Sequence, residues 1–117
     1  MALSLSALPA AHAGEAVTLA LPSIEVVETP DGLSVSGMVI GLDRGTVEAT
    51  LTVARQDTSG STVSRQAQSL EVMPGSRHVV ATIALSVSGG AGLEVGLVLR
   101  RADRIIAEAQ TRLMPTP

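Results

Sequence analysis

Aromatic residues and cysteine are absent from this sequence of 117 residues, and so are lysine and asparagine. Without cysteine the chain has no thiol nucleophile, no thiolate zinc site and no disulfide framework. Without Phe, Tyr and Trp, the core must consist of Val, Leu, Ile, Met and Ala, whose burial stabilises by at most about 3 kcal/mol per side chain. Because lysine is missing, arginine carries every basic charge apart from the two histidines.

Length and charge narrow the classes of function. The chain is long enough for one domain with one core. Its formal net charge is −3, so no basic excess is available to displace counterions from a nucleic acid. No apolar run is long enough to cross a bilayer. We therefore expect neither a nucleic-acid partner nor insertion into a membrane.

The first 13 residues have the composition of an export signal. Ala2–Leu8 is small and apolar, and Ala11-His12-Ala13 fits the A-x-A pattern that precedes a cleavage point. No positively charged region comes before the apolar stretch. We predict a signal-peptide remnant at residues 1–13 and a single domain at residues 14–117 that lies outside the cytoplasm.

Apolar and polar residues alternate with a period of two through most of the remaining chain. This period is typical of half-buried strands, and short strands separated by frequent turn signals are typical of an immunoglobulin-like sandwich. The predicted fold class is therefore all-β, an immunoglobulin-like two-sheet β-sandwich with seven to eight antiparallel strands. The expected strands are Ile24–Thr29, Leu33–Ile40, Val47–Val53, Thr62–Gln68, Leu70–Val72, Val79–Val87, Leu93–Arg100 and Ile105–Arg112.

Several strands carry finer expectations. Thr62–Gln68 is polar and is predicted to be an edge strand, whereas Gly37 inside a strand predicts a bulge or a close approach of two backbones. Strict alternation predicts that Val79 faces the same side as Ala81, Ile83 and Leu85, and that Ile105 faces the same side as Ala107 and Ala109. Residues 105–110 also fit a short helix by propensity, but the closely spaced strand before them favours a strand.

Residues that commonly carry chemistry are few and scattered. His12 lies in the signal segment, and His78 begins a strand, where we expect it to be solvated. A zinc site needs three or four converging ligands. Ser76 or Ser86 beside His78 lacks the G-x-S-x-G elbow of a hydrolase. We therefore expect no enzyme activity, no catalytic residue, no cofactor and no metal.

Arginine placement is the remaining distinctive feature. Two arginines flank the small-residue loop at residues 57–61, and others gather around the last hairpin. Ordinary solubility and protection of sheet edges explain such residues. They also suit contact with an acidic or amide-rich partner, because the guanidinium fork donates to carboxylates and carbonyls. The candidate partner-binding residues are Arg55, Arg65, Arg100, Arg101, Arg104 and Arg112.

An ordered series of segments runs through most of the chain after the signal segment. They are Ile24-Glu25-Val26, Leu33–Gly37, Thr46–Arg55, Ser59–Gln66 and the Pro74-Gly75 turn, followed by two closing strands. In their order and spacing they resemble CsgH-like curli assembly domains, which are related to CsgC. The resemblance implies an immunoglobulin-like sandwich in the periplasm. It also implies no catalytic residues to carry over, and the C-x-C pair of CsgC is missing here, so a redox role does not follow.

The function implied by this resemblance is that of a chaperone-like inhibitor that prevents premature amyloid polymerisation of the curli major subunit. We expect a monomer whose exposed strand edge and arginines contact extended conformers of that partner. Two alternatives stay open: a structural or adhesive sandwich module of an extracellular assembly, and a hydrolase or sugar-binding domain. The lack of aromatic residues and asparagine also has two explanations, which are codon bias and avoidance of cross-β stacking.

Overall fold

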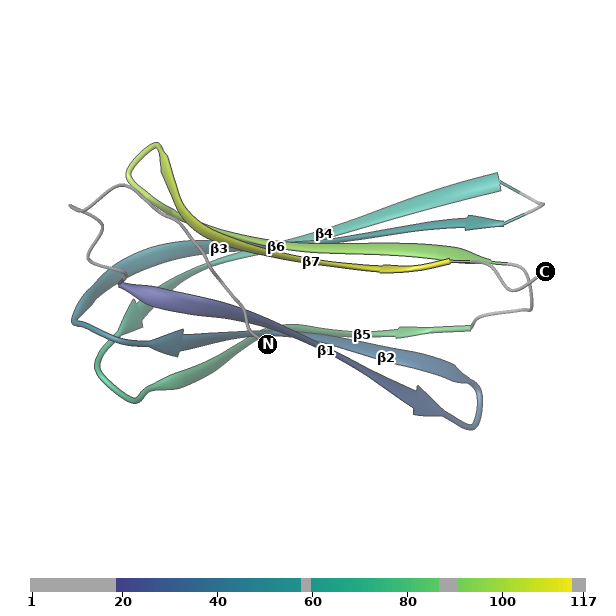
Figure 1. Ribbon diagram of the computed structural model, residues 1–117, viewed down its shortest axis with the longest axis horizontal. Helices are drawn as coiled ribbons and strands as arrows, with labels where there is room; N and C mark the ends of the chain where they lie inside the picture. Colours follow the sequence, from purple (N-terminus) through teal and green to yellow (C-terminus); the bar gives the residue numbers. More distant parts are fainter. Residues whose placement is uncertain (1–18, 58–59, 87–90, 115–117) are drawn as a thin grey trace.

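The computed structural model describes residues 19–57, 60–86 and 91–114 (Figure 1). Within these ranges the chain forms seven strands and no helix, which confirms the predicted all-β class. The predicted signal segment, residues 1–13, lies outside the described residues. The strands are β1 (Ala20–Thr29), β2 (Gly32–Gly41), β3 (Gly45–Asp57), β4 (Gly60–Val72), β5 (Arg77–Leu85), β6 (Gly92–Arg101) and β7 (Arg104–Leu113).

The strands form two antiparallel sheets that pack face to face, as predicted for a β-sandwich (Figure 1). One sheet has the order β1-β2-β5 and the other has the order β4-β3-β6-β7. Across the sandwich β1 lies against β7, and β5 lies against β4. The stretches at residues 62–68 and 70–72, predicted to be separate, form one continuous strand, β4. Each lateral side of the sandwich is therefore bordered by two edge strands.

The core between the sheets is aliphatic, and among the described residues it contains no buried polar or charged residue. The central strands β2, β3 and β6 supply most of it through alternate residues that face the opposite sheet. Because aromatic side chains are missing, the stability of the core comes from many small contributions of aliphatic side chains. The largest fully buried side chains are Leu51, Leu97, Leu99, Val35, Val39, Val47, Val53 and Val95.

Gly37 lets the two sheets approach each other at the centre of the core. A Cβ atom added there would lie 3.1 Å from Cδ1 of Leu51 and 3.4 Å from Cδ2 of Leu97, both on the opposite sheet. The register between β2 and β5 also shifts between Gly37 and Met38. The predicted bulge is therefore confirmed, whereas the close neighbours of Gly37 are leucine side chains and not a second backbone.

The same bulge changes which side chains of β5 face the core. A bulge inserts one extra residue and so reverses the alternation beyond it. Val79 is consequently 54% exposed and Val80 only 4%, so the prediction that Val79 faces the core is wrong. His78 is half-buried opposite Val39. The prediction that His78 is solvated is also wrong, because its Nε2 is buried and has no hydrogen-bond partner among the described residues.

A second bulge has the same effect at the start of β7. The register between β6 and β7 shifts between Leu99 and Arg100. Ile105 is 54% exposed, whereas Ile106 packs against the core. The prediction that Ile105 shares the inner face with Ala107 is therefore wrong, since an alternation pattern read from sequence carries no sign of the inserted residue.

Backbone hydrogen bonds tie the end of β2 to the β4–β5 connection. The amide of Gly41 donates to the carbonyl of Ser76 (2.8 Å), and the amide of Gly75 donates to the carbonyl of Gly41 (2.9 Å). Inside the connection, the amide of Met73 donates to Oγ of Ser76 (3.1 Å). Gly75 has a φ of 84°, which favours glycine. These bonds fix the β2–β3 turn and the β4–β5 turn in position relative to each other.

Candidate partner-binding surfaces

One end of the sandwich carries five of the arginines. The β2–β3, β4–β5 and β6–β7 connections meet at this end, which we call the turn end and which comprises residues 41–45, 73–77 and 100–104 (Figure 1). Within the described parts of the chain, none of its guanidinium groups forms an ion pair. All but the half-buried Arg100 are exposed. The arginines of the turn end are Arg44, Arg77, Arg100, Arg101 and Arg104.

The β6–β7 hairpin places two of these arginines side by side. Arg101 and Arg104 are partners in the strand register, and only Ala102 and Asp103 separate them. Ala102 has a φ of 55°, a left-handed conformation that costs a residue other than glycine about 1–2 kcal/mol. Like charges on directly opposite residues repel each other. The hairpin therefore places two exposed arginines at directly opposite positions, at an energetic cost.

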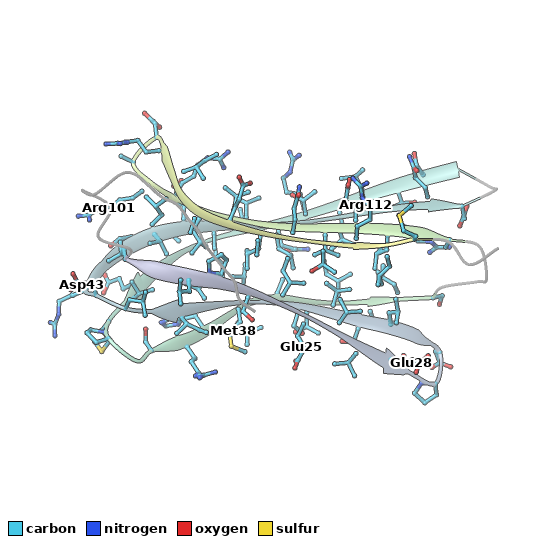
Figure 2. The ribbon with its side chains drawn as sticks, viewed as in Figure 1. Glu25, Glu28, Met38, Asp43, Arg101 and Arg112 are labelled. Atoms are coloured by element: carbon cyan, nitrogen blue, oxygen red, sulfur yellow. The ribbon has the colours of Figure 1, made fainter. Side chains whose placement is uncertain are left out.

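The predicted arginines do not form a single surface. Arg100, Arg101 and Arg104 share the turn end. In Figure 2, Arg101 and Asp43 mark this end of the molecule, and Glu28 marks the opposite end. Arg55 and Arg112 lie toward the end opposite the turn end, and Arg65 lies midway along β4. Whether any of the six contacts a partner stays a prediction.

Arg55 and Arg112, which lie neither at the turn end nor on β4, are each neutralised by a carboxylate. Nη2 of Arg55 donates to Oδ2 of Asp57 at 2.9 Å, and the two side chains are 30% and 14% exposed. Nε of Arg112 donates to Oε2 of Glu94 at 3.0 Å, and its Nη2 bonds the same oxygen. These pairs leave less free positive charge here than at the turn end.

Two arginines of the turn end, Arg44 and Arg77, were missed because they stand in or beside turns whose position in space the sequence prediction did not use. In an antiparallel chain every second turn returns to the same end of a sheet. With residues 60–72 taken as one strand, counting the turns would have placed Arg44, Arg77 and the last hairpin together. The signal was present in the order of the turns and not in any local motif.

The edge of β4 is the second exposed surface. From Gly60 to Ser69 every residue is exposed except the half-buried Ser64. Four polar residues of this strand stand opposite inward-facing residues of β3 and therefore lie on the core side of the sheet. Of these, Gln68 donates from Nε2 to the carbonyl of Val80 on β5 at 3.0 Å, which links the two sheets. This polar row consists of Thr62, Ser64, Gln66 and Gln68.

Groups that could perform chemistry are not gathered in one place. Among the described residues, no three His, Asp or Glu side chains are arranged to hold a metal ion. Oγ of Ser76 accepts a hydrogen bond from the Met73 amide, and Nε2 of His78 has no partner within the described ranges. These residues therefore do not show the hydrogen bond to Nε2 that a serine nucleophile needs. The described residues also contain no helix long and apolar enough to span a membrane.

A shallow depression of about 310 Å³ lies on the outer face of the four-stranded sheet. Its lining includes Ala54, Gly92 and the Glu94–Arg112 ion pair. Among the described residues that line it, Glu94 is the one carboxylate and is already paired with a guanidinium, whereas glycoside hydrolysis requires two carboxyl groups. The depression therefore gives no support to the hydrolase alternative.

Comparisons with known proteins give a consistent picture of the fold. Neither the models of protein families nor the curated proteins contain a match to this sequence. Among solved structures, the solution structure of R. palustris CsgH aligns with a TM-score of 0.62 at 17% identity, covering 82% of this chain and 92% of CsgH. The E. coli curli protein CsgC aligns with a TM-score of 0.68 at 11% identity, covering 78% and 96% respectively.

The chain has the fold of CsgH and CsgC. This confirms the fold that the ordered segments of the sequence implied. A glycosyl hydrolase of family 2 from Bacteroides cellulosilyticus also aligns, with a TM-score of 0.54 at 17% identity, and there the match covers 85% of this chain but 15% of the enzyme. The CsgH-like fold thus corresponds to one part of a much larger enzyme, whereas it corresponds to nearly the whole of CsgH and CsgC.

Proposed function

We propose that this protein is a chaperone-like inhibitor in the periplasm that prevents premature amyloid polymerisation of the curli major subunit. The observation that carries the proposal is the CsgH-like fold, which spans 92% of CsgH and 96% of CsgC. A match over nearly the whole of two small curli proteins favours a role in curli assembly over a role as one module of an enzyme.

The surface chemistry is compatible with transient capture of an extended partner. Arginine donates to carboxylates and to backbone carbonyls through the same planar fork. At the turn end, Arg101 and Arg104 are exposed and, in the described structure, unpaired with any carboxylate. Charged side chains near a bound strand also hinder the stacking of further strands. The turn end therefore offers attraction to a disordered chain together with resistance to continued growth.

Purified protein mixed with the curli major subunit at a substoichiometric ratio tests the proposal. Thioflavin fluorescence follows polymerisation, and we expect a lag phase that lengthens with the amount of inhibitor. A lag phase that stays the same at every ratio would show that the protein is not an inhibitor of this process.

Reversing the charge of two arginines tests the turn end specifically. The double variant Arg101→Glu/Arg104→Glu removes the exposed guanidinium groups of the hairpin, and we expect it to lose most of the lag extension. Arg100 is left unchanged because it stands opposite Glu48 in the register, and a glutamate there would place two carboxylates across from each other.

Arg112→Gln is the control, since it removes a positive charge away from the turn end, where Arg112 already pairs with Glu94. Glutamine is used because a glutamate would stand directly opposite Glu94 in the register. Exposed ion pairs contribute at most about 1 kcal/mol, so the control should remain folded. Full inhibition by the double variant, or equal loss in the control, would place the contact elsewhere.

A structural or adhesive module would behave differently in solution. It would form a lasting complex of fixed stoichiometry, which elutes as a single earlier peak in size-exclusion chromatography. A transient inhibitor would delay polymerisation while eluting at its own position.

A further inference from the structure

The four edge strands of this sandwich differ in how well they are protected against pairing with another chain. An unprotected edge presents free backbone N–H and C=O groups to any extended segment, and proteins block such edges with proline, charges or bulges. β1 contains Pro22 together with Glu25 and Glu28. β5 has nine residues, begins with Arg77 and is interrupted by the bulge beside Gly37.

β7 is protected in the same ways. It carries Arg104, Glu108 and Arg112, and its pairing with β6 is interrupted by a bulge. Three of the four edges therefore have at least one device that discourages an added strand.

β4 has almost none of these devices. It is 13 residues long and contains no proline. Its pairing with β3 runs without a register shift from Gly45↔Val72 to Asp57↔Gly60. Between Gly60 and Leu70 its one charged residue is Arg65. An edge of this length, regularity and low charge is the kind to which another strand adds.

Side chains of β4 determine which strand would fit beside it. A strand added to a sheet places its side chains about 4.5–5.5 Å from those directly opposite, measured between Cβ atoms. On the core side it would meet the polar row of β4. Gln66, Ser64 and Thr62 make no side-chain hydrogen bond in the part of the chain that the structure describes. An apolar residue opposite Gln66 would remove water from that amide without replacing its hydrogen bonds.

We infer that the edge of β4 from Thr62 to Ser69 accepts an extended strand of a partner chain that carries amide and hydroxyl side chains at alternate positions. Such side chains exchange hydrogen bonds with the polar row of β4, as in cross-strand hydroxyl pairs and amide ladders. On the outer face the added strand meets Val63, Arg65 and Ala67. Arg65 favours a neutral or acidic neighbour there and disfavours a basic one. The inference rests on the proposed function in naming the chemistry of the segment that the inhibitor captures.

A short synthetic peptide tests this site independently of curli polymerisation. The probe is an eight-residue peptide with Gln and Ser alternating with Thr, capped at both ends and N-methylated at every second residue. N-methylation leaves one hydrogen-bonding edge, so the probe can pair with β4 without stacking on itself. Titrated into the full isotope-labelled protein, it should shift the NMR resonances of residues 61–69 and slow their amide exchange, with β1 and β7 unchanged.

A pair of matched variants makes the test specific. Gln66→Lys places a charge in the polar row of β4 and should weaken binding of the probe by at least about ten-fold, a change of roughly 1.4 kcal/mol. Gln110→Lys makes the same change on β7, the other edge of the same sheet, and should bind the probe like the wild type. Both glutamines are exposed, so thermal unfolding should show that both variants remain folded.

Several outcomes would overturn the inference. Shifts confined to β1, β5 or β7, no shifts at all, or unchanged binding by Gln66→Lys would show that β4 is not the acceptor. Concentration-dependent shifts of β4 without the probe, together with dimers in sedimentation, would assign the edge to a second copy of this chain. Lag extension without binding of the probe would leave the proposed function in place and remove the β4 site. Binding of the probe without lag extension would keep the β4 site and remove the proposed function.

Discussion

Gly41 occupies a position where a larger side chain does not fit. A Cβ atom there would overlap the carbonyl oxygen of Met73 and lie 3.0 Å from the Met73 amide nitrogen. Because the obstacle is backbone, rotation of a flexible side chain cannot relieve it. We predict that Gly41→Ala destabilises the fold by at least about 3 kcal/mol. Thermal unfolding followed by far-ultraviolet circular dichroism measures the change, with an expected loss of at least about 10 °C in Tm.

Gly96→Ala is the control for this substitution. A Cβ atom at Gly96 would lie 4.0 Å from Cγ of Gln110, which is ordinary contact. Loss of conformational freedom in the unfolded chain should then keep the stability unchanged or raise it by up to about 1 kcal/mol. Similar melting temperatures for the two variants would show that a side chain at position 41, at the end of β2, can be accommodated.

Sequence reasoning anticipated some single residues and not others, for a physical reason. Gly37 was recognised because a glycine inside a strand is itself a local signal. Val79, His78 and Ile105 were misplaced because each precedes an inserted residue that the alternation does not reveal. The consequence of Gly41 could not be foreseen, since it depends on Met73, which is distant in sequence.

Among the elements, β4 combines two segments with different expected stabilities. Leu70 and Val72 are buried, whereas nearly all of Gly60–Ser69 is exposed. Segments with few buried apolar contacts open at lower free energy than the core. We predict that amides of residues 61–68 exchange with solvent at least about ten-fold faster than those of the central strand β3.

Hydrogen exchange followed by NMR resolves this difference along one strand. The amides of residues 70–72 provide an internal reference, because they belong to the same strand but lie beside the core. Equal protection across all of β4 would show that its exposed half is held as firmly as its buried half.

Element positions were well predicted where one face is buried. Strands β2, β3 and β6 alternate cleanly because both neighbours and the opposite sheet constrain them. β4 was predicted as two strands, since its pattern changes from polar to apolar at Leu70. The change marks the point where the strand enters the core and not a break in the backbone.

Over the whole molecule, charge is unevenly distributed. The turn end carries exposed, unpaired arginines, while Arg55 and Arg112 away from it are neutralised within the described structure. If these free charges attract the partner, we predict that inhibition is stronger at about 10 mM salt, where the Debye length is about 30 Å, than at about 0.15 M, where it is about 8 Å.

Lag times measured at both salt concentrations check this, with polymerisation of the subunit alone as the baseline. The Arg101→Glu/Arg104→Glu variant should show little dependence on salt. A wild-type effect that is equal at both concentrations would exclude long-range attraction as the cause.

The global fold was predictable and the arrangement of the candidate surfaces was not. Strand number, sheet class and the CsgH-like fold follow from the alternation and from the order of segments. The six predicted arginines comprise two that flank the loop at residues 57–61 and four on or near the last hairpin. Arg65 is separated laterally from the hairpin arginines by the sheet order β4-β3-β6-β7, which alternation alone does not specify. Arg55 and Arg112 are separated from them along the strands, toward the opposite end of the sheet.

The absence of aromatic residues makes this protein nearly transparent in the near ultraviolet. With no Trp, Tyr or Phe, it has no intrinsic fluorophore and almost no absorbance at 280 nm. Any tyrosine or tryptophan emission in a mixture must therefore arise from the partner. Capture of a partner that contains such residues can be followed without attaching a dye to either chain.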